Sequence, residues 1–132
     1  MADRYAGIIR SYAKAPFTNG VPVDLLGRSS NAPVTLPANS FVEVIFFRAN
    51  DPLIGSNGAI TVGTLATPDS VVAAADGVTT SGVSNFDLQL GRVGALRSAT
   101  TADQILVLTS STDISAGEIE VKLFYVVYND LP

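Results

Sequence analysis

The chain has 132 residues, a net charge of −4 and no cysteine or histidine. This length suits one domain, which buries about two thirds of the surface of its unfolded chain without needing disulfides or metal. The missing residue types exclude Ser-His-Asp and Cys-His catalytic devices and metal–thiolate sites. The eight lysines and arginines are scattered, so no basic stripe is available for phosphates and nucleic acid is not an expected partner.

The beginning of the sequence gives no targeting signal. Residues 1–5 include the acidic Asp3, and they lack the basic start and apolar run of a secretory signal. Charge, glycine or proline interrupts every apolar run, so no membrane-spanning helix is expected. We therefore expect synthesis in the cytoplasm. Only 15% of the residues are charged, against about 25% in typical domains, which indicates that neighbouring subunits cover part of the surface.

Residues 4–13 and 21–26 are expected to be extended. A short helical turn over residues 8–14 is the alternative. The first 14 residues are also a candidate arm that contacts neighbouring subunits, and packing of this arm on its own domain is the competing interpretation. If it is an arm, its removal should weaken attachment and leave the fold intact. The arm residues proposed for an interface are Arg4, Tyr5, Ile8, Ile9 and Tyr12.

The middle of the chain predicts several short strands. Residues 41–48 and 59–65 are strands separated by turn residues. Asp76-Gly77 is a strong two-residue hairpin signal between residues 71–75 and 78–81. Residues 86–90 alternate apolar and polar side chains, and the loop after them holds Arg92 and Arg97. Arginine is enriched in protein interfaces, so these two are candidate interface anchors, with solvated loop charges as the alternative.

The last two predicted strands cover residues 103–109 and 118–128, and the loop between them predicts an antiparallel hairpin. In the first half of the final strand, apolar side chains alternate with charged ones, which indicates one buried and one wet face. After Leu123 both faces become apolar, so another part of the chain or another subunit must cover this half. Phe124, Val126 and Tyr128 are therefore proposed interface residues.

These elements predict an all-β fold. Strand-forming residues dominate, and there are only three glutamates and two lysines from which to build helices. Residues 1–132 are expected to form a single antiparallel β-sandwich or jelly roll of about eight short strands. A small closed β-barrel is the alternative.

Few residues are suited to catalysis or to binding a metal or phosphate. Glu118 and Glu120 lie two apart on one strand face and are the only nominees for acid–base work, but Lys122 follows on the same face and indicates a solvated surface instead. The aspartates lie mostly in turns, where they cap backbone amides. The sequence lacks a calcium-loop pattern and a phosphate-binding glycine motif. We expect no enzyme, no cofactor and no metal.

Three phrases of the sequence carry a resemblance that covers about residues 33–127. They are Thr35-Leu36-Pro37-Ala38-Asn39-Ser40-Phe41-Val42, Ala59-Ile60-Thr61-Val62-Gly63-Thr64 with Pro68-Asp69-Ser70, and Asp103-Gln104-Ile105-Leu106-Val107-Leu108 followed by Ile114-Ser115-Ala116-Gly117-Glu118-Ile119-Glu120-Val121. Their order resembles that of small β proteins of tailed-phage and other large double-stranded DNA virus particles, which serve as capsid decoration or cement subunits. The resemblance implies a subunit, often trimeric, that sits on the major capsid shell at the virion surface and joins neighbouring capsomers.

Two functional hypotheses follow from the sequence. The first is a homo-oligomeric structural protein of the virion, a decoration or cement subunit that binds and stabilises the major capsid protein shell. The alternative is a fibre-head or vertex module that recognises a host receptor or glycan through its loops. The chain has no tryptophan, and residues 51–58 and 91–101 carry no aromatic platform for a sugar, which favours the first hypothesis.

Overall fold

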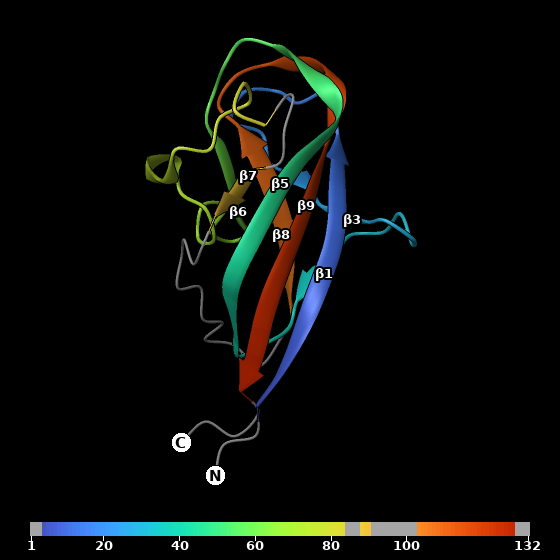
Figure 1. Cartoon of the computed structure of the whole chain (residues 1–132), viewed down its shortest axis with the longest axis vertical. Helices are drawn as coiled ribbons and strands as arrows, with labels where there is room; N and C mark the ends of the chain where they lie inside the picture. Colours follow the sequence, from blue (N-terminus) through green and yellow to red (C-terminus); the bar gives the residue numbers. More distant parts are fainter. Residues whose placement is uncertain (1–3, 84–87, 91–102, 129–132) are drawn as a thin grey trace.

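The computed structural model describes residues 4–83, 88–90 and 103–128. They form an all-β sandwich of two antiparallel sheets, which confirms the predicted fold class (Figure 1). Within this part of the chain, no helix is long and apolar enough to cross a membrane. The elements are β1 (Arg4–Lys14), β2 (Val23–Asp24), β3 (Leu26–Gly27), β4 (Thr35–Leu36), β5 (Ser40–Gly55), β6 (Ile60–Thr64), the 3₁₀ turn η1 (Ala74–Asp76), β7 (Leu88–Leu90), β8 (Gln104–Ser110) and β9 (Ile114–Tyr128).

The strand order is that of a jelly roll. The five-stranded sheet runs β3-β1-β9-β5-β7, and in the second sheet β8 pairs with β2 and β4 along one edge and with β6 along the other. From β4 onward the chain alternates between the sheets, so each successive strand crosses the core. Both sheets are open, and the closed-barrel alternative is therefore wrong.

The N-terminal segment belongs to the sandwich itself. β1 pairs with β9 along its whole length, from Arg4 opposite Tyr128 to Lys14 opposite Glu118. It also pairs with β3. The short helical turn considered for residues 8–14 is therefore wrong, and the segment packs on its own domain. Its removal would take a strand out of the sheet, so from the structure we expect this deletion to disrupt the fold.

The core lies between the two sheets and forms one cluster of buried side chains. β9 supplies Val121 and Leu123 and β5 supplies Phe47, while Leu106 and Leu108 face them from β8; all five are fully buried. Burying a side chain of this size contributes about 1.5–3 kcal/mol. The alternation predicted for the final strand thus places its apolar residues on the inner face.

Strand β5 is twice as long as predicted. The predicted strand ends at Arg48, shortly before Asn50, Asp51 and Pro52, which are unfavourable in strands. In the structure, β-bulges interrupt its pairing with β9 between Ala49 and Gly55. Bulges leave residues outside the regular ladder, which accommodates a proline that cannot donate a hydrogen bond.

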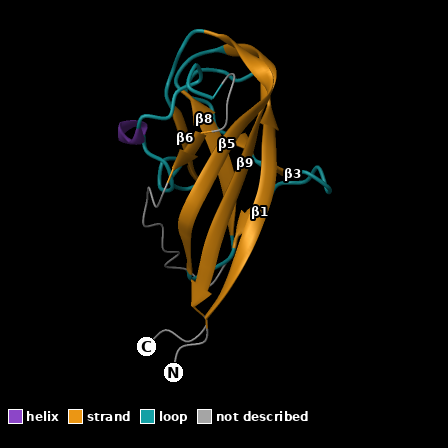
Figure 2. Cartoon of the chain, viewed as in Figure 1, coloured by secondary structure: helices purple, strands orange, loops and turns teal. Residues whose placement is uncertain are grey.

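The hairpin predicted at Asp76-Gly77 is wrong. Asp76 ends η1, the short helical turn drawn in purple in Figure 2. Its side chain accepts a hydrogen bond from the backbone N–H of Ala73 at 2.8 Å. Gly77 follows with φ +79, the left-handed conformation that glycine favours at such a cap. The flanking residues pair elsewhere, Val72 with Val62 and Thr79 with Ala59.

The hairpin predicted between the last two strands is also wrong. β8 and β9 are joined by three residues, yet they lie in different sheets. β9 starts at Ile114, earlier than predicted, because its first residues pair with the end of β5 and bridge to Phe17. Short connections are typical of hairpins, but here both strands bury an apolar face in the same core from opposite sides.

Candidate functional site

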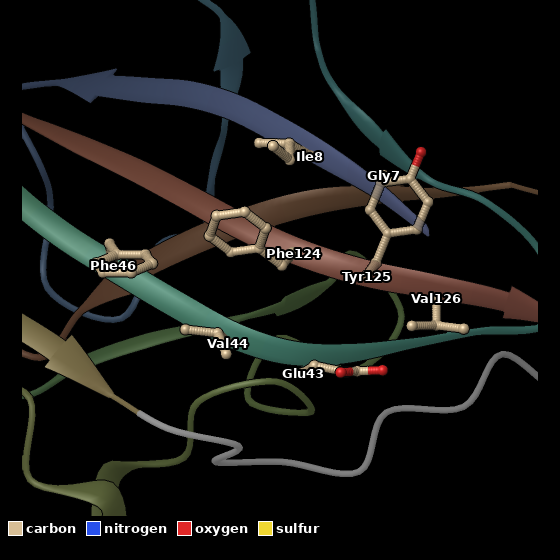
Figure 3. A pocket seen from close by; sticks show the side chains of 8 residues that line it. All are labelled: Gly7, Ile8, Glu43, Val44, Phe46, Phe124, Tyr125 and Val126. Atoms are coloured by element: carbon tan, nitrogen blue, oxygen red, sulfur yellow. The ribbon is translucent and has the colours of Figure 1, made fainter. Parts of the chain in front are cut away.

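The outer face of the five-stranded sheet carries a groove of about 590 Å³ (Figure 3). It occupies the half of the face that lies toward the start of β1 and the end of β9. Both faces of β9 were predicted to be apolar in this half, and the groove is where the second apolar face meets solvent. We call this surface the groove; its lining residues are Gly7, Ile8, Glu43, Val44, Phe46, Phe124, Tyr125 and Val126.

Strand register brings the groove residues together. Phe124 of β9 pairs with Ile8 of β1 on one side and with Val44 of β5 on the other, so the three side chains form a row across the sheet. Phe46 meets Phe124 edge to face at 5.7 Å between ring centroids. Ile8 is 51% exposed, on a part of β1 that lies beyond its pairing with β3. The groove is therefore an apolar surface open to contact.

Gly7 and Tyr125, which also line the groove, make a close contact across β1 and β9. Gly7 pairs with Tyr125, and the tyrosine ring lies across the glycine backbone. A Cβ at Gly7 would lie only 2.5 Å from Cζ and Oη of Tyr125. In this register Gly7 and Tyr125 face the inner side of the sheet, as Ile9 and Leu123 do, and Tyr125 packs against the core. The absence of a side chain at Gly7 makes room for the ring there.

The other half of the outer face is charged. Glu118 and Glu120 of β9 both accept hydrogen bonds from Arg28 Nη2, at 3.1 and 3.2 Å. Asn50 Nδ2 donates to the same two carboxylates, at 2.8 and 3.0 Å. We call these four residues the carboxylate network. It joins β9 to β5 and to the loop after β3, which projects beside the sheet in Figure 2.

The network lowers the pKa of both carboxyl groups. Burial alone would raise the pKa of Glu118, but hydrogen bonds from Asn50 and Arg28 and the charges of Arg28 and Lys14 outweigh it. For Glu120 the Asn50 hydrogen bond is the largest cause, and Arg28 and Arg48 act in the same direction. A carboxyl group that acts as a general acid at neutral pH needs a raised pKa, whereas the pKa values of both glutamates are lowered.

Arg28 is fixed by more than its ion pairs. Its guanidinium lies over the ring of Tyr12 at 4.5 Å from the centroid, and the Tyr12 hydroxyl donates to Asn31 Oδ1. Burial would lower the pKa of Arg28, but the two glutamates raise it above its ordinary value. Tyr12, predicted as an interface residue, therefore contributes to the charged half and not to the groove.

Lys122 lies at the boundary between the halves. Its ammonium group is 5.5 Å from the Phe46 ring centroid and 5.8 Å from that of Phe124. A cation over aromatic faces is attracted by the ring quadrupole. Lys122 thus follows the charged residues Glu118 and Glu120 along β9, while its side chain contacts two aromatic rings of the groove.

The structure brings together three of the predicted interface residues, Ile8, Phe124 and Val126. Ile9 points the other way and packs against the core, which corrects its assignment to an exposed surface. Adjacent isoleucines on a strand must face opposite sides. The remaining predicted residues have no described side chain: Arg4, Tyr5 and Tyr128 lie at the paired ends of β1 and β9, and Arg92 and Arg97 lie outside the described residues.

Sequence reasoning missed Val44, Phe46, Arg28 and Asn50. The apolar residues of 41–48 were the signal for the first two. A strand whose odd-numbered and even-numbered residues are both apolar has two faces that favour burial. No local pattern marks the other two, since they reach the glutamates from distant segments. Among the described residues, no group of three or more aspartates or glutamates forms a candidate metal site.

Charge is unevenly distributed over the described side chains. All five described basic side chains lie on the outer face of the five-stranded sheet, in the charged half or in the boundary row of Lys122; the residues are Arg10, Lys14, Arg28, Arg48 and Lys122. Five described aspartates lie away from this face, in the second sheet and the loops: Asp24, Asp69, Asp76, Asp103 and Asp113. An acidic protein therefore presents its cations beside its apolar groove.

Two phage capsids contain chains of similar structure. A chain in the capsid asymmetric unit of cyanophage Pam1 superposes with a TM-score of 0.57 and 12% identity, over 96% of this chain and 86% of that chain. A chain in the acidic stable capsid of Helicobacter pylori bacteriophage KHP30 gives 0.55 and 13%, over 99% of this chain and 100% of that chain. No protein-family model and no curated protein matches the sequence. At these identities, the shared property is the fold.

Proposed function

We propose that this chain is a structural protein of a phage virion, a decoration or cement subunit that binds the major capsid protein shell and stabilises it. The observation that carries the proposal is the fold likeness to chains of two phage capsids along nearly the whole of this chain. In KHP30 the likeness covers all of the matched chain, so there a polypeptide of this architecture alone is part of a capsid.

The outer face of the five-stranded sheet supports a binding role. Ile8 is 51% exposed beside Phe124, in a groove of about 590 Å³. Exposed apolar surface surrounded by polar residues marks protein contacts, and a low content of charged residues fits a molecule whose neighbours cover it. We propose the virion surface as its location and neighbouring virion subunits, including further copies of this chain, as its partners.

The direct test is the protein content of particles purified from the phage that encodes the chain. Mass spectrometry of those particles should find it in a fixed ratio to the major capsid protein, and antibodies should label it on the shell. Deletion of its gene should yield shells that release DNA at a lower temperature. Absence from purified particles would contradict the proposal, and labelling confined to fibres or vertices would support the receptor-binding alternative instead.

A second test asks whether the groove makes the contact with the shell. Ile8→Asp places a charge in the apolar row and should abolish co-sedimentation with shells that lack the protein. Ser81→Asp, at an exposed residue outside the groove, is the matched control and should bind as the unchanged protein does. Equal binding of both variants would remove the groove from the proposal.

A further inference from the structure

The edge of β1 that faces away from β9 is only partly covered. β3 lies on this side, but it pairs with residues 11–12 alone, and beside them the Arg28 N–H donates to the carbonyl of Arg10 at 3.4 Å. Within the described part of the chain, no strand pairs with the first half of β1 on this side, which runs along the lower right edge of the sheet in Figure 1. We call the backbone of residues 4–9 along this side the free edge.

The hydrogen bond at Arg10 fixes which residues present their backbone groups at the free edge. Successive residues of a strand direct their N–H and C=O groups to opposite edges. The Arg10 carbonyl points toward the β3 side, and β1 keeps an uninterrupted register against β9 from its first residue to its last. The even-numbered residues Arg4, Ala6 and Ile8 therefore direct their N–H and C=O groups to the free edge, while the odd-numbered residues between them bond to β9.

The free edge lacks the features that usually prevent another strand from adding to a sheet. Proteins commonly protect edge strands with a proline, a bulge or a charged side chain. Residues 5–9 contain no proline and no charge, and their ladder with β9 has no register shift. β5, on the other side of β9, has several register shifts and contains Pro52. The free edge is therefore a regular, uncharged ladder to which a second strand can add.

The free edge of a second copy satisfies all of these groups at once. If the two edges run antiparallel with Ala6 opposite Ala6, then Arg4 of each copy lies opposite Ile8 of the other. Each such pair exchanges two backbone hydrogen bonds, so every N–H and C=O group directed to the free edge gains a partner in both copies. A pairing centred on Ile8 would need the Arg10 carbonyl, which the loop after β3 already occupies. A pairing centred on Gly7 would place Arg4 opposite Arg10, and like charges directly opposite are destabilising.

We infer that two copies of this chain form a two-fold dimer in which their free edges pair antiparallel, with Ala6 opposite Ala6, and join the two five-stranded sheets into one. A contact of this kind uses the same surface on both copies and closes on itself. Its two-fold axis is perpendicular to the joined sheet, so both grooves face the same side. The inference goes beyond the proposed function, which assigns the groove to the shell, because the dimer leaves both grooves open for that contact.

A proline at Ala6 tests the pairing, because it removes an N–H that only the second copy uses. Strands tolerate proline where the N–H faces away from the ladder, so Ala6→Pro should keep the circular dichroism spectrum of the unchanged protein. In light scattering over a range of concentrations, the unchanged protein should form dimers, and Ala6→Pro should weaken them by at least about tenfold. Ala6→Val keeps the N–H and is the matched control. A folded Ala6→Pro variant that dimerises normally would overturn the inference, as would an unchanged protein that is monomeric at every concentration.

A disulfide cross-link tests the register and does not depend on how the proline variant folds. The chain has no cysteine, so a single introduced cysteine can form a disulfide only between copies. The Cα atoms of a hydrogen-bonded pair lie about 5.5 Å apart, within the range that a disulfide spans. Ala6→Cys should therefore give a covalent dimer under mild oxidation, whereas Ile8→Cys, which lies opposite Arg4, should not. Cross-linking at Ile8 and not at Ala6 would contradict the pairing. Virion content is measured separately, so a monomer that is present on the shell would sink only this inference, and a dimer that is absent from particles would sink only the proposed function.

Discussion

On the outer face of the five-stranded sheet, the charged half and the groove differ in whether their side chains find partners within the chain. Glu118 and Glu120 are each held by Arg28 and Asn50, which come from other segments. In the groove, Ile8 remains half exposed although its neighbours are apolar. One half is therefore completed by folding and the other offers surface for binding. Changes in the first should act on stability, and changes in the second on association.

The largest effect should come from removing residues 1–14, because β1 contributes to both halves. The deletion leaves one edge of β9 without its eleven paired residues and exposes the inner side of the sheet. We expect no cooperative thermal unfolding, measured by circular dichroism. Deletion of residues 1–3 alone, which leaves β1 whole, is the control. A cooperative transition in the longer deletion would show that β1 is dispensable for the fold.

The next prediction compares the same substitution, phenylalanine to alanine, on the inner and the outer face of the five-stranded sheet. Phe47→Ala empties a fully buried core position and should cost about 3–5 kcal/mol of unfolding free energy. Phe124→Ala removes a partly buried ring and should cost about 1–2 kcal/mol, while impairing association. Urea unfolding measures both. Equal losses would mean that the groove is part of the core.

Acid should act on the charged half. Both glutamate pKa values in the fold lie below the unfolded value of about 4.3, so their stabilisation is complete above that pH and is lost as the pH falls through the folded values. Glu118→Gln with Glu120→Gln should cost about 1–2 kcal/mol at pH 7 and flatten the fall of stability below pH 4.3. Unfolding free energies in urea between pH 7 and pH 3 test this.

Glu43→Gln is the matched control for that experiment. Glu43 lies on the same sheet face but outside the carboxylate network. The variant should retain the pH dependence of the unchanged protein. If it flattened the curve as much as the double variant, the network would not be the origin of the acid sensitivity.

The smallest effect should arise at the boundary. Lys122→Met keeps the aliphatic stem and removes the cation over Phe46 and Phe124, which should cost about 0.5 kcal/mol. Arg10→Met removes a charge from the paired position on β1 and is the control. Losses of the same size in both variants would indicate a general charge effect rather than a contact with the rings.

The fold was predictable where one strand could be recognised from its own residues. The alternation in residues 118–124 and the apolar residues of 103–109 identified β9 and β8 because burial on one face leaves a period of two. The apolar second half of β9 likewise marked Phe124 and Val126, which line the groove. Its neighbours Val44 and Phe46 required the register of β5 against β9, which depends on a bulge near Glu43 that no local sequence signal specifies.

The connections and the charged half were not predictable in this way. Asp76-Gly77 is compatible with a hairpin or with a 3₁₀ turn, and only the pairing of Val72 with Val62 decides between them. The link from β8 to β9 is short enough for a hairpin, yet both strands face one core. Arg28 and Asn50 reach Glu118 across 90 and 68 residues of sequence, which a local pattern cannot reveal.

The central position of β9 has a consequence for how the molecule is made. In the five-stranded sheet it lies between β1 and β5, and it is the last of the nine described strands to leave the ribosome. Until then, β1 and β5 lack the strand that joins them. Contacts this distant in sequence slow folding, so the sheet should assemble only after β9 has been synthesised, in the step that places β9 between them.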